Sequence, residues 1–242
     1  MQGVDPAIDI AIDHRVRAFL KKLNSAGGKP LEELAPRDAR AVLTSLQASV
    51  KLELPPAQVS ELSINEDGQH VDLTIVRPAG EQKTIPAFMF FHGGGWVPGD
   101  FPTHERFVRD LVAESGATAV FVNYTPSPEA HYPVAINQAY AATKWVAEFG
   151  REINLDGRRL AVVGNSVGGN MAAVVALMAK NKGGPELRFQ ALMWPVTDAC
   201  FDTQSYHEFA EGRFLTRNMM QWFWDCYTSD PNERAELKRR LR

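Results

Sequence analysis

The sequence has few cysteines and no long hydrophobic run. Its 242 residues include Cys200 and Cys226, whose spacing fits no metal site, so we expect reduced thiols, no metal and no cofactor. No apolar run is long enough to cross a bilayer, and the first five residues lack the basic and apolar segments of a secretory signal. These absences predict a cytoplasmic protein with no integral membrane association.

A strong charge of either sign is also lacking. The formal net charge is -3, which gives no electrostatic reason to expect nucleic acid or an anionic membrane as a partner. Apolar residues make up 45% of the chain, which is ample for one large core, and no internal repeat is present. We therefore expect a single domain over residues 1–242.

The first eighty residues contain two predicted helices and a predicted hairpin. Asp5-Pro6 matches the cap and first position of an amphipathic helix whose apolar residues recur from Ile8 to Leu23. A second amphipathic helix is expected at about residues 37–50. Alternating apolar and polar residues on both sides of Glu66-Asp67-Gly68 predict an antiparallel hairpin. The two helices either pack on the core or form a lid, and both alternatives stay open.

From Phe88 onward, short apolar runs alternate with helical segments as far as Val163, which predicts a parallel sheet with right-handed crossovers. A further strand is expected at residues 189–194, then an irregular excursion to about residue 214. Thr216 is expected to cap an aromatic helix that ends near Tyr227. The predicted parts are a helical cap segment (1–50), core sheet and helices (57–195), cap excursion and helix (196–228), and basic tail (229–242).

A serine lies between two glycines where a predicted strand turns into a helix. The segment Gly164-Asn-Ser166-Val-Gly168 follows the strand at residues 160–163 and precedes a helix at about residues 171–180. Glycine at both flanking positions lets the chain turn tightly and expose the serine hydroxyl, as in a nucleophile elbow. Taken alone, the pattern also fits a glycine-rich loop whose serine caps a helix.

A second glycine motif favours the elbow. His92-Gly-Gly-Gly-Trp96 follows another predicted strand, at residues 86–91. Three glycines after a strand permit close backbone approach and can turn amides inward, as an oxyanion hole requires. Both motifs follow strands, so we expect both at the carboxyl edge of the sheet.

With these motifs the chain resembles the hormone-sensitive-lipase-like esterases of the α/β-hydrolase superfamily. Further matching segments are Tyr124-Thr-Pro-Ser-Pro-Glu129, Tyr132-Pro133 and Phe214-Leu-Thr-Arg-Asn-Met219. The resemblance implies an α/β-hydrolase fold: a mostly parallel central sheet, helices on both faces and an N-terminal helical cap. It also implies that Ser166 is the nucleophile and that the amides of Gly94, Gly95 and Val167 form the oxyanion hole. His92, Gly93, Gly164 and Gly168 would shape the two motifs.

The sequence departs from the pattern of this family in three ways. Asn165 and Val167 stand where such families usually carry Asp and Ala. More seriously, no segment like those carrying the family's catalytic Asp and His follows Ser166, so we expect the C-terminal strands to be missing and residues 189–194 to form a sheet edge. Asp198, Asp202 and His207 are candidate replacements, although a loop carboxylate and a cap histidine are the simpler interpretations.

The leading hypothesis is a carboxylic ester hydrolase acting on short acyl esters through an acyl-enzyme, impaired by the lack of the downstream Asp and His. The alternative is a non-catalytic protein that binds a small ligand on the same fold. Hydrolysis of a thioester or amide is a third interpretation, because the motifs recognise the oxyanion rather than the leaving group. The expected partner is a small-molecule ester, and a homodimer is left open.

Overall fold

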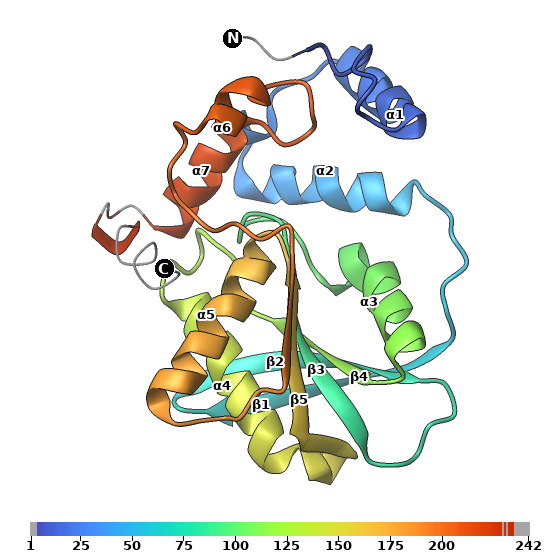
Figure 1. Cartoon of the computed structure of the whole chain (residues 1–242), viewed down its shortest axis with the longest axis vertical. Coiled ribbons are helices and arrows are strands. Elements are labelled where there is room, and N and C mark those ends of the chain that lie inside the picture. Colours follow the sequence, from blue (N-terminus) through green and yellow to red (C-terminus); the bar gives the residue numbers. More distant parts are fainter. Residues whose placement is uncertain (1–3, 229, 231, 235–242) are drawn as a thin grey trace.

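The computed structural model, which describes residues 4–228, 230 and 232–234, is built around a twisted sheet (Figure 1). Within these residues the sheet has six strands in the order β1-β2-β4-β3-β5-β6. The strands are β1 (Ala57–Glu66), β2 (Gln69–Pro78), β3 (Ile85–Phe91), β4 (Thr118–Asn123), β5 (Leu155–Asn165) and β6 (Phe189–Met193).

The sheet is mostly parallel from β4 to β6. β3 pairs in parallel with both β4 and β5, and β5 pairs in parallel with β6. β1 and β2 form the predicted antiparallel hairpin, and β2 adds antiparallel to β4. β3 and β4 are almost wholly buried, which explains why they read as continuous apolar runs in the sequence. β6 forms an edge of the sheet among the described residues, with Phe189 and Trp194 exposed.

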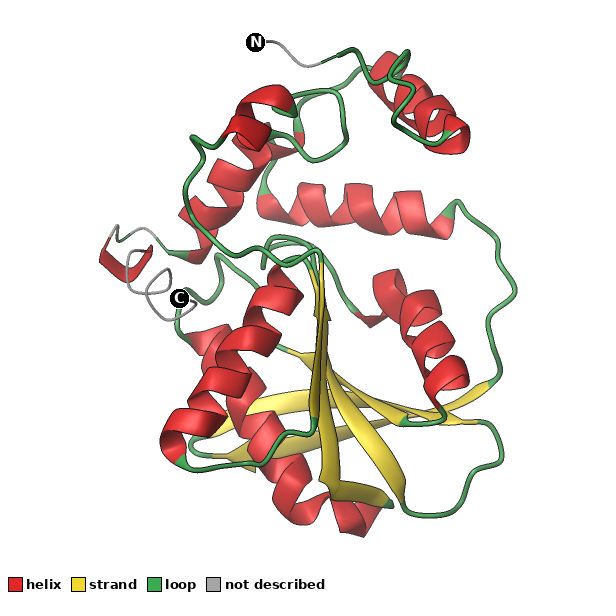
Figure 2. Ribbon diagram, viewed as in Figure 1, coloured by secondary structure: helices red, strands yellow, loops and turns green. Residues whose placement is uncertain are grey.

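Helices cover both faces of the sheet (Figure 2). One face carries α4 (Val134–Phe149) and α5 (Val167–Lys182), which pack against Met89, Phe91 and Val162. The other face carries α3 (Phe101–Ser115), which packs against Phe88 and Phe90. The alternation of residues along β3 thus supplies both cores. The predicted fold class is confirmed: this is a mostly parallel sheet between two helical layers.

The remaining helices gather above the carboxyl ends of the strands (Figure 1). They are α1 (His14–Ser25), α2 (Pro36–Ala48), α6 (Gln204–Glu208) and α7 (Arg217–Tyr227), with short 3-10 turns at Leu31–Glu33 and, in the core, at Gly150–Ile153. Thr216 caps α7 as predicted, since its hydroxyl accepts a hydrogen bond of 3.0 Å from the Met219 amide. The basic tail predicted for residues 229–242 lies mostly outside the described residues.

The predicted start of the first helix is wrong. α1 begins at His14, because the Asp13 carboxylate accepts a hydrogen bond of 2.9 Å from the Arg15 amide and caps the helix there. Upstream, the carboxylates of Asp5 and Asp9 accept hydrogen bonds from the amides of Ala7 and Ala11. Such local turns compete with helix formation, so the apolar spacing around Ile8 does not continue the helix.

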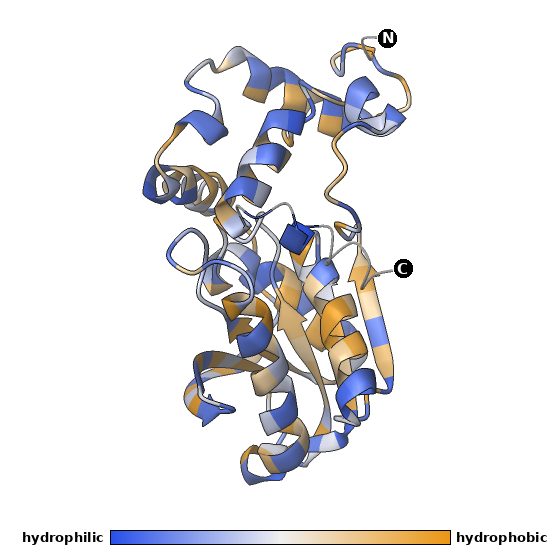
Figure 3. Ribbon diagram, turned by 90° about the vertical axis from the view of Figure 1, so that its left-hand side faces the viewer, coloured by the Kyte–Doolittle hydropathy of each residue, from blue (hydrophilic) through white to orange (hydrophobic). Residues whose placement is uncertain are grey.

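Apolar residues are concentrated in the strands and the helices beside them, whereas the outer helices alternate hydrophilic and hydrophobic positions (Figure 3). Over the described part of the chain, the helices fall short of the length and apolar character that crossing a membrane requires.

Candidate active site

The turn from β5 into α5 places Ser166 in a strained backbone conformation. Its φ of 56° and ψ of -122° lie outside the regions that non-glycine residues normally occupy. A Cβ atom at Gly164 would collide with the carbonyl oxygen of Gly168, and one at Gly168 would collide with that of Phe91. The turn therefore requires glycine at both positions, as the elbow pattern predicts.

The backbone of Ser166 is held firmly while its side chain is left unbonded. The Ser166 amide donates to the Met193 carbonyl at 2.9 Å, and the Ser166 carbonyl accepts from the Gly169 amide at 3.0 Å. The half-buried Ser166 hydroxyl makes no hydrogen bond with any described residue. The serine is thus fixed in place with its hydroxyl available to react.

The triglycine loop lies beside this turn because β3 and β5 are neighbours. Phe91, the last residue of β3, stands opposite Gly164 in the parallel register. Beyond the strands, the Gly93 amide donates a hydrogen bond of 3.0 Å to the side-chain Oδ1 of Asn165. This bond joins the first glycine of the loop directly to the residue before Ser166.

Close packing forces glycine at the next two positions. Gly94 has a φ of 113°, and a Cβ there would collide with the Pro98 carbonyl oxygen. Gly95 has a φ of 64°, and a Cβ there would collide with the ring of Phe223 on α7. Both residues therefore have a backbone conformation that disfavours a side chain, and both lie too close to their neighbours to leave room for one.

Three amides of the two motifs have no acceptor among the described residues. The Gly94 and Gly95 amides form no hydrogen bond with the described residues. Val167 is the first residue of α5, so its amide has no partner within the helix. Unpaired amides at a helix N-terminus stabilise a negatively charged group that binds beside them. Unpaired amides of a loop that is shielded from water do the same.

His92 is enclosed and uncharged near neutral pH. Burial, and secondarily the nearby His104, lowers the pKa of His92 to about 3. Its ring stacks between Phe121 and Tyr124, at centroid distances of 5.4 and 4.2 Å. Its Nδ1 donates to the Gly93 carbonyl at 2.8 Å, which supports the interpretation that His92 orients the loop rather than acting as a base.

The candidate replacements for the missing acid and base are engaged elsewhere. His207 Nε2 lies 3.1 Å from an Asp202 carboxylate oxygen on the surface of the cap, and its side chain is half exposed. The Asp198 carboxylate accepts a hydrogen bond of 3.1 Å from the Cys200 amide. Within the described ranges, the structure shows no hydrogen bond from Ser166 to any of these groups. Cys200 and Cys226 are unpaired thiols.

Three contacts at the site were not predicted from the sequence: the Asn165 side chain, Phe223 against Gly95, and Arg40 against the loop after Gly95. Asn165 was noticed only as a departure from the family pattern. The aromatic periodicity of residues 219–227 predicted a helix with a buried face, but not what that face covers. Arg40 resembles any solvated residue of an amphipathic helix, so no sequence signal distinguishes it.

The cap contains a large apolar groove. Its volume is about 1170 Å³, and it lies between α1, α2 and the segment at residues 208–214. Leu20, Leu43, Leu46, Phe209 and Phe214 are among its lining residues, whereas Ser166 is not. The cap helices thus pack around a groove of their own as well as above the sheet.

Neighbouring parallel strands bring both glycine motifs to the same edge, and a serine on a strained strand-to-helix turn there is the layout of the α/β-hydrolase fold. The family described as alpha/beta hydrolase fold matches residues 88–239, and the chain belongs to this family.

Several relatives are esterases, which confirms the resemblance to hormone-sensitive-lipase-like enzymes. A carboxylesterase of Mycobacterium tuberculosis, NlhH, is 35% identical over 225 residues, which are 93% of this chain and 67% of that protein. An ethyl acetate hydrolase of Pseudomonas putida is 30% identical over 185 residues, 75% of this chain and 58% of that protein. The crystal structure of a thermostable esterase from Pseudomonas putida ECU1011 is 63% identical, with a TM-score of 0.92 over 94% of this chain and 71% of that chain. The chain therefore spans roughly three fifths to seven tenths of these proteins.

Proposed function

We propose that the chain carries the nucleophile and oxyanion hole of a carboxylic ester hydrolase that acts on short acyl esters. The proposal is carried by two observations: the two motifs are bonded to each other beside Ser166, and the amides of Gly94, Gly95 and Val167 have no acceptor among the described residues. The esterase relatives support the reaction class. The name of the ethyl acetate hydrolase supports a short acyl group.

The reaction begins with attack of the Ser166 oxygen on the ester carbonyl. The carbonyl oxygen becomes an oxyanion that accepts hydrogen bonds from the three amides, and losing one such donor typically slows the reaction by ~10²–10³. Collapse of this intermediate expels the alcohol, which takes up a proton, and leaves the acyl group on Ser166. Water then attacks the acyl-enzyme, releases the acid and restores the hydroxyl.

Both steps need a base for the proton of Ser166 or of water. Among the described residues no histidine is hydrogen bonded to Ser166, and removing the base of a triad alone can cost ~10⁶ in kcat. We therefore propose that this chain reacts slowly with esters, although the oxyanion hole still favours acylation.

The test is prolonged labelling with a fluorophosphonate probe, whose phosphorus is attacked by the serine oxygen with loss of fluoride. The parent chain and a Ser205→Ala control, altered in the cap, should be labelled slowly, whereas Ser166→Ala should stay unlabelled. Equal labelling of Ser166→Ala and the parent would remove Ser166 from its role. Turnover is measured separately with p-nitrophenyl acetate and p-nitrophenyl decanoate, and the acetate should be the better substrate.

A second candidate is a non-catalytic protein that holds a small acid or ester in the same site. It is favoured by the combination of unpaired amides with a Ser166 hydroxyl that has no hydrogen-bonded base in the described part of the chain. Saturable binding of acetate or ethyl acetate without labelling or turnover would support it. A cytoplasmic location stays a prediction of the sequence, and hydrolysis of a thioester or amide and a homodimer stay open alternatives.

A further inference from the structure

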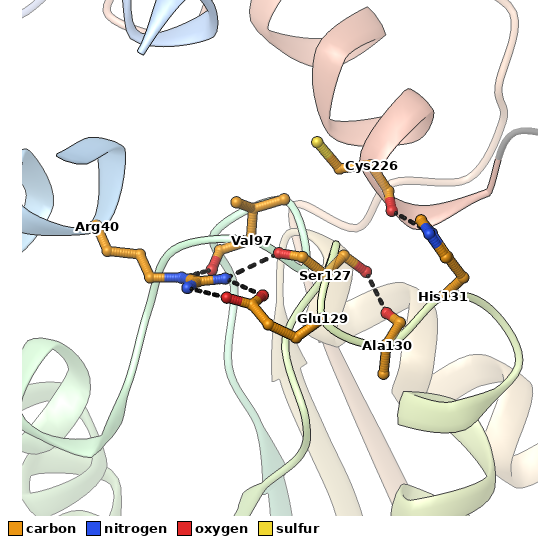
Figure 4. Close-up of polar contacts among 7 residues, drawn as sticks. All are labelled: Arg40, Val97, Ser127, Glu129, Ala130, His131 and Cys226. Carbon is orange, nitrogen blue, oxygen red and sulfur yellow. Dashed lines mark hydrogen bonds and ion pairs between the residues drawn. The ribbon is translucent and has the colours of Figure 1, made fainter. Parts of the chain in front are cut away.

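One arginine of the cap reaches the loop that follows the triglycine motif (Figure 4). Arg40, on α2, donates from Nε to the Val97 carbonyl at 2.9 Å and from a terminal nitrogen to the Ser127 carbonyl at 2.9 Å. Both terminal nitrogens also pair with the Glu129 carboxylate, at 2.7 and 2.6 Å. A single guanidinium thus joins the cap to two loops of the core.

Of the two carbonyls that Arg40 binds, that of Val97 belongs to the triglycine turn, and that of Ser127 belongs to a second loop that is bonded to the turn. The Val97 amide donates to the Gly94 carbonyl at 3.1 Å and closes the turn. The Ser127 amide donates to the Trp96 carbonyl at 2.8 Å. The bond from Val97 holds the carbonyl of the Gly94–Gly95 peptide plane, and the Gly95 amide lies in that same plane. Arg40 in turn holds Val97 through its carbonyl. The Gly94 amide lies in the preceding plane, whose Gly93 carbonyl accepts a hydrogen bond from His92.

The loop that carries Ser127 and Glu129 is anchored at its far end to another part of the cap. His131 Nδ1 donates to the Cys226 carbonyl of α7 at 2.8 Å (Figure 4), and the Tyr132 amide donates to the Tyr227 carbonyl at 2.8 Å. The same helix presses Phe223 against Gly95. Arg40 and α7 thus hold the triglycine loop from two sides.

The contact suits arginine and not lysine. The Arg40 side chain is 27% exposed, and its planar fork satisfies two carbonyls and both oxygens of one carboxylate at once. A lysine ammonium keeps the positive charge but cannot make the four hydrogen bonds of the guanidinium in the same geometry. The hydrogen bond from Arg40 also lowers the pKa of Glu129, so the carboxylate stays ionised near neutral pH.

We propose that Arg40 is a positioning residue for the oxyanion hole: by fixing the carbonyls of Val97 and Ser127, it holds the turn that orients the Gly95 amide. This inference rests on the proposed function of that amide. It differs from a simple tether between cap and core, because a tether would affect the docking of α2 and leave the turn unchanged.

Hydrogen exchange at the peptide covering residues 92–99 tests the proposal without requiring turnover. In Arg40→Lys, exchange in this peptide should be about tenfold faster than in the parent. The matched control is Arg109→Lys on α3, where Arg109 also pairs with a glutamate, Glu105, and donates to a carbonyl, that of Pro55 at 3.0 Å. The control should leave residues 92–99 unchanged.

In Arg40→Lys, the rate at which the fluorophosphonate labels Ser166 should fall ~10-fold or more, because the oxyanion donors are weakened. In the control Arg109→Lys, the labelling rate should not fall. Glu129→Gln leaves the bonds from Arg40 to the two carbonyls in place. It should therefore change both the exchange rate and the labelling rate less than Arg40→Lys does. If Arg40→Lys does not fold, the two measurements are made on Glu129→Gln instead. Unchanged exchange at residues 92–99 in a folded Arg40→Lys would overturn the proposal. A parent chain that is not labelled would instead contradict the proposed function, while the exchange result would still decide the role of Arg40.

Discussion

Asn165 shows how a single side chain can join two motifs that lie far apart in the sequence. Its Oδ1 accepts the Gly93 amide at 3.0 Å and thereby substitutes for a backbone acceptor just beyond the ends of β3 and β5. The requirement for glycine at positions 164 and 168 was predictable, because the pattern itself encodes a tight turn. The partner of Gly93 was not, because side-chain direction depends on the neighbouring strand rather than on local sequence.

Two substitutions of Asn165 separate the contribution of its hydrogen bond to stability from the contribution of its side-chain volume. Asn165→Leu leaves the buried Gly93 amide without an acceptor and should lower the free energy of unfolding by about 1–3 kcal/mol. Asn165→Asp keeps an acceptor oxygen and should lie within about 1 kcal/mol of the parent. Urea unfolding followed by tryptophan fluorescence measures both. Equal stabilities for the two variants would show that the bond to Gly93 contributes nothing.

At the scale of elements, α7 supports the triglycine loop by direct packing. Trp96 stacks on Tyr227 at a centroid distance of 4.0 Å and meets Trp224 edge-on at 4.9 Å, while Phe223 lies against Gly95. All four side chains of this cluster, with Phe223 included, are at least 95% buried. The helix was predictable from its aromatic spacing and its Thr216 cap. Its contact with Gly95 depends on how the chain returns from β6, which no local pattern specifies.

Removing the Phe223 ring tests this support. Phe223→Ala should lower the free energy of unfolding by about 3–5 kcal/mol, because the ring fills space that Gly95 leaves open. Gln221→Ala on the same helix is the control and should change stability by less than about 0.5 kcal/mol. Urea unfolding again gives the values. A Phe223→Ala variant as stable as the control would mean that α7 does not support the loop.

For the whole molecule, the order and type of most elements were predictable, whereas the contacts between distant segments were not. β3 and β4 are recognisable because both of their faces are buried, and α4 (Val134–Phe149) is one of the helical segments predicted between Phe88 and Val163. The start of α1 failed because aspartate side chains form turns that no apolar periodicity reveals. Arg40 and Glu129 are 89 residues apart, and only the assembled fold brings them together.

The stability of the whole molecule should depend on pH below about 6.5. Burial lowers the pKa of His92 from 6.5 to about 3, so unfolding takes up a proton throughout that interval. The stability that His92 contributes is therefore complete above pH 6.5 and declines by up to about 1.4 kcal/mol per pH unit as the pH falls toward 3. Burial also lowers the pKa of His104, which acts in the same direction.

Acidic groups add to the decline at lower pH. Arginine partners lower the pKa of Glu129 and Asp156, so their contributions are present above the ordinary values of 4.5 and 3.8 and are lost as the pH falls below them. Urea unfolding between pH 4 and 8 should show the decline, with a smaller slope between pH 6.5 and 5 in His92→Gln. The control His14→Gln alters a side chain that is 78% exposed and should keep the parent slope. A parent stability that is constant from pH 6.5 to 5 would refute this account of His92.

The backbone conformation of Ser166 lowers the stability of the fold, so stability alone does not account for a serine at this position. At a φ of 56° and a ψ of -122°, any residue with a side chain is disfavoured by on the order of 1–3 kcal/mol relative to glycine. A lineage selected only for a robust fold would drift toward glycine at position 166 and gain thermal resistance by doing so. Under the proposed function, the serine found there is explained by its hydroxyl, which is retained although glycine at this position would make the fold more stable.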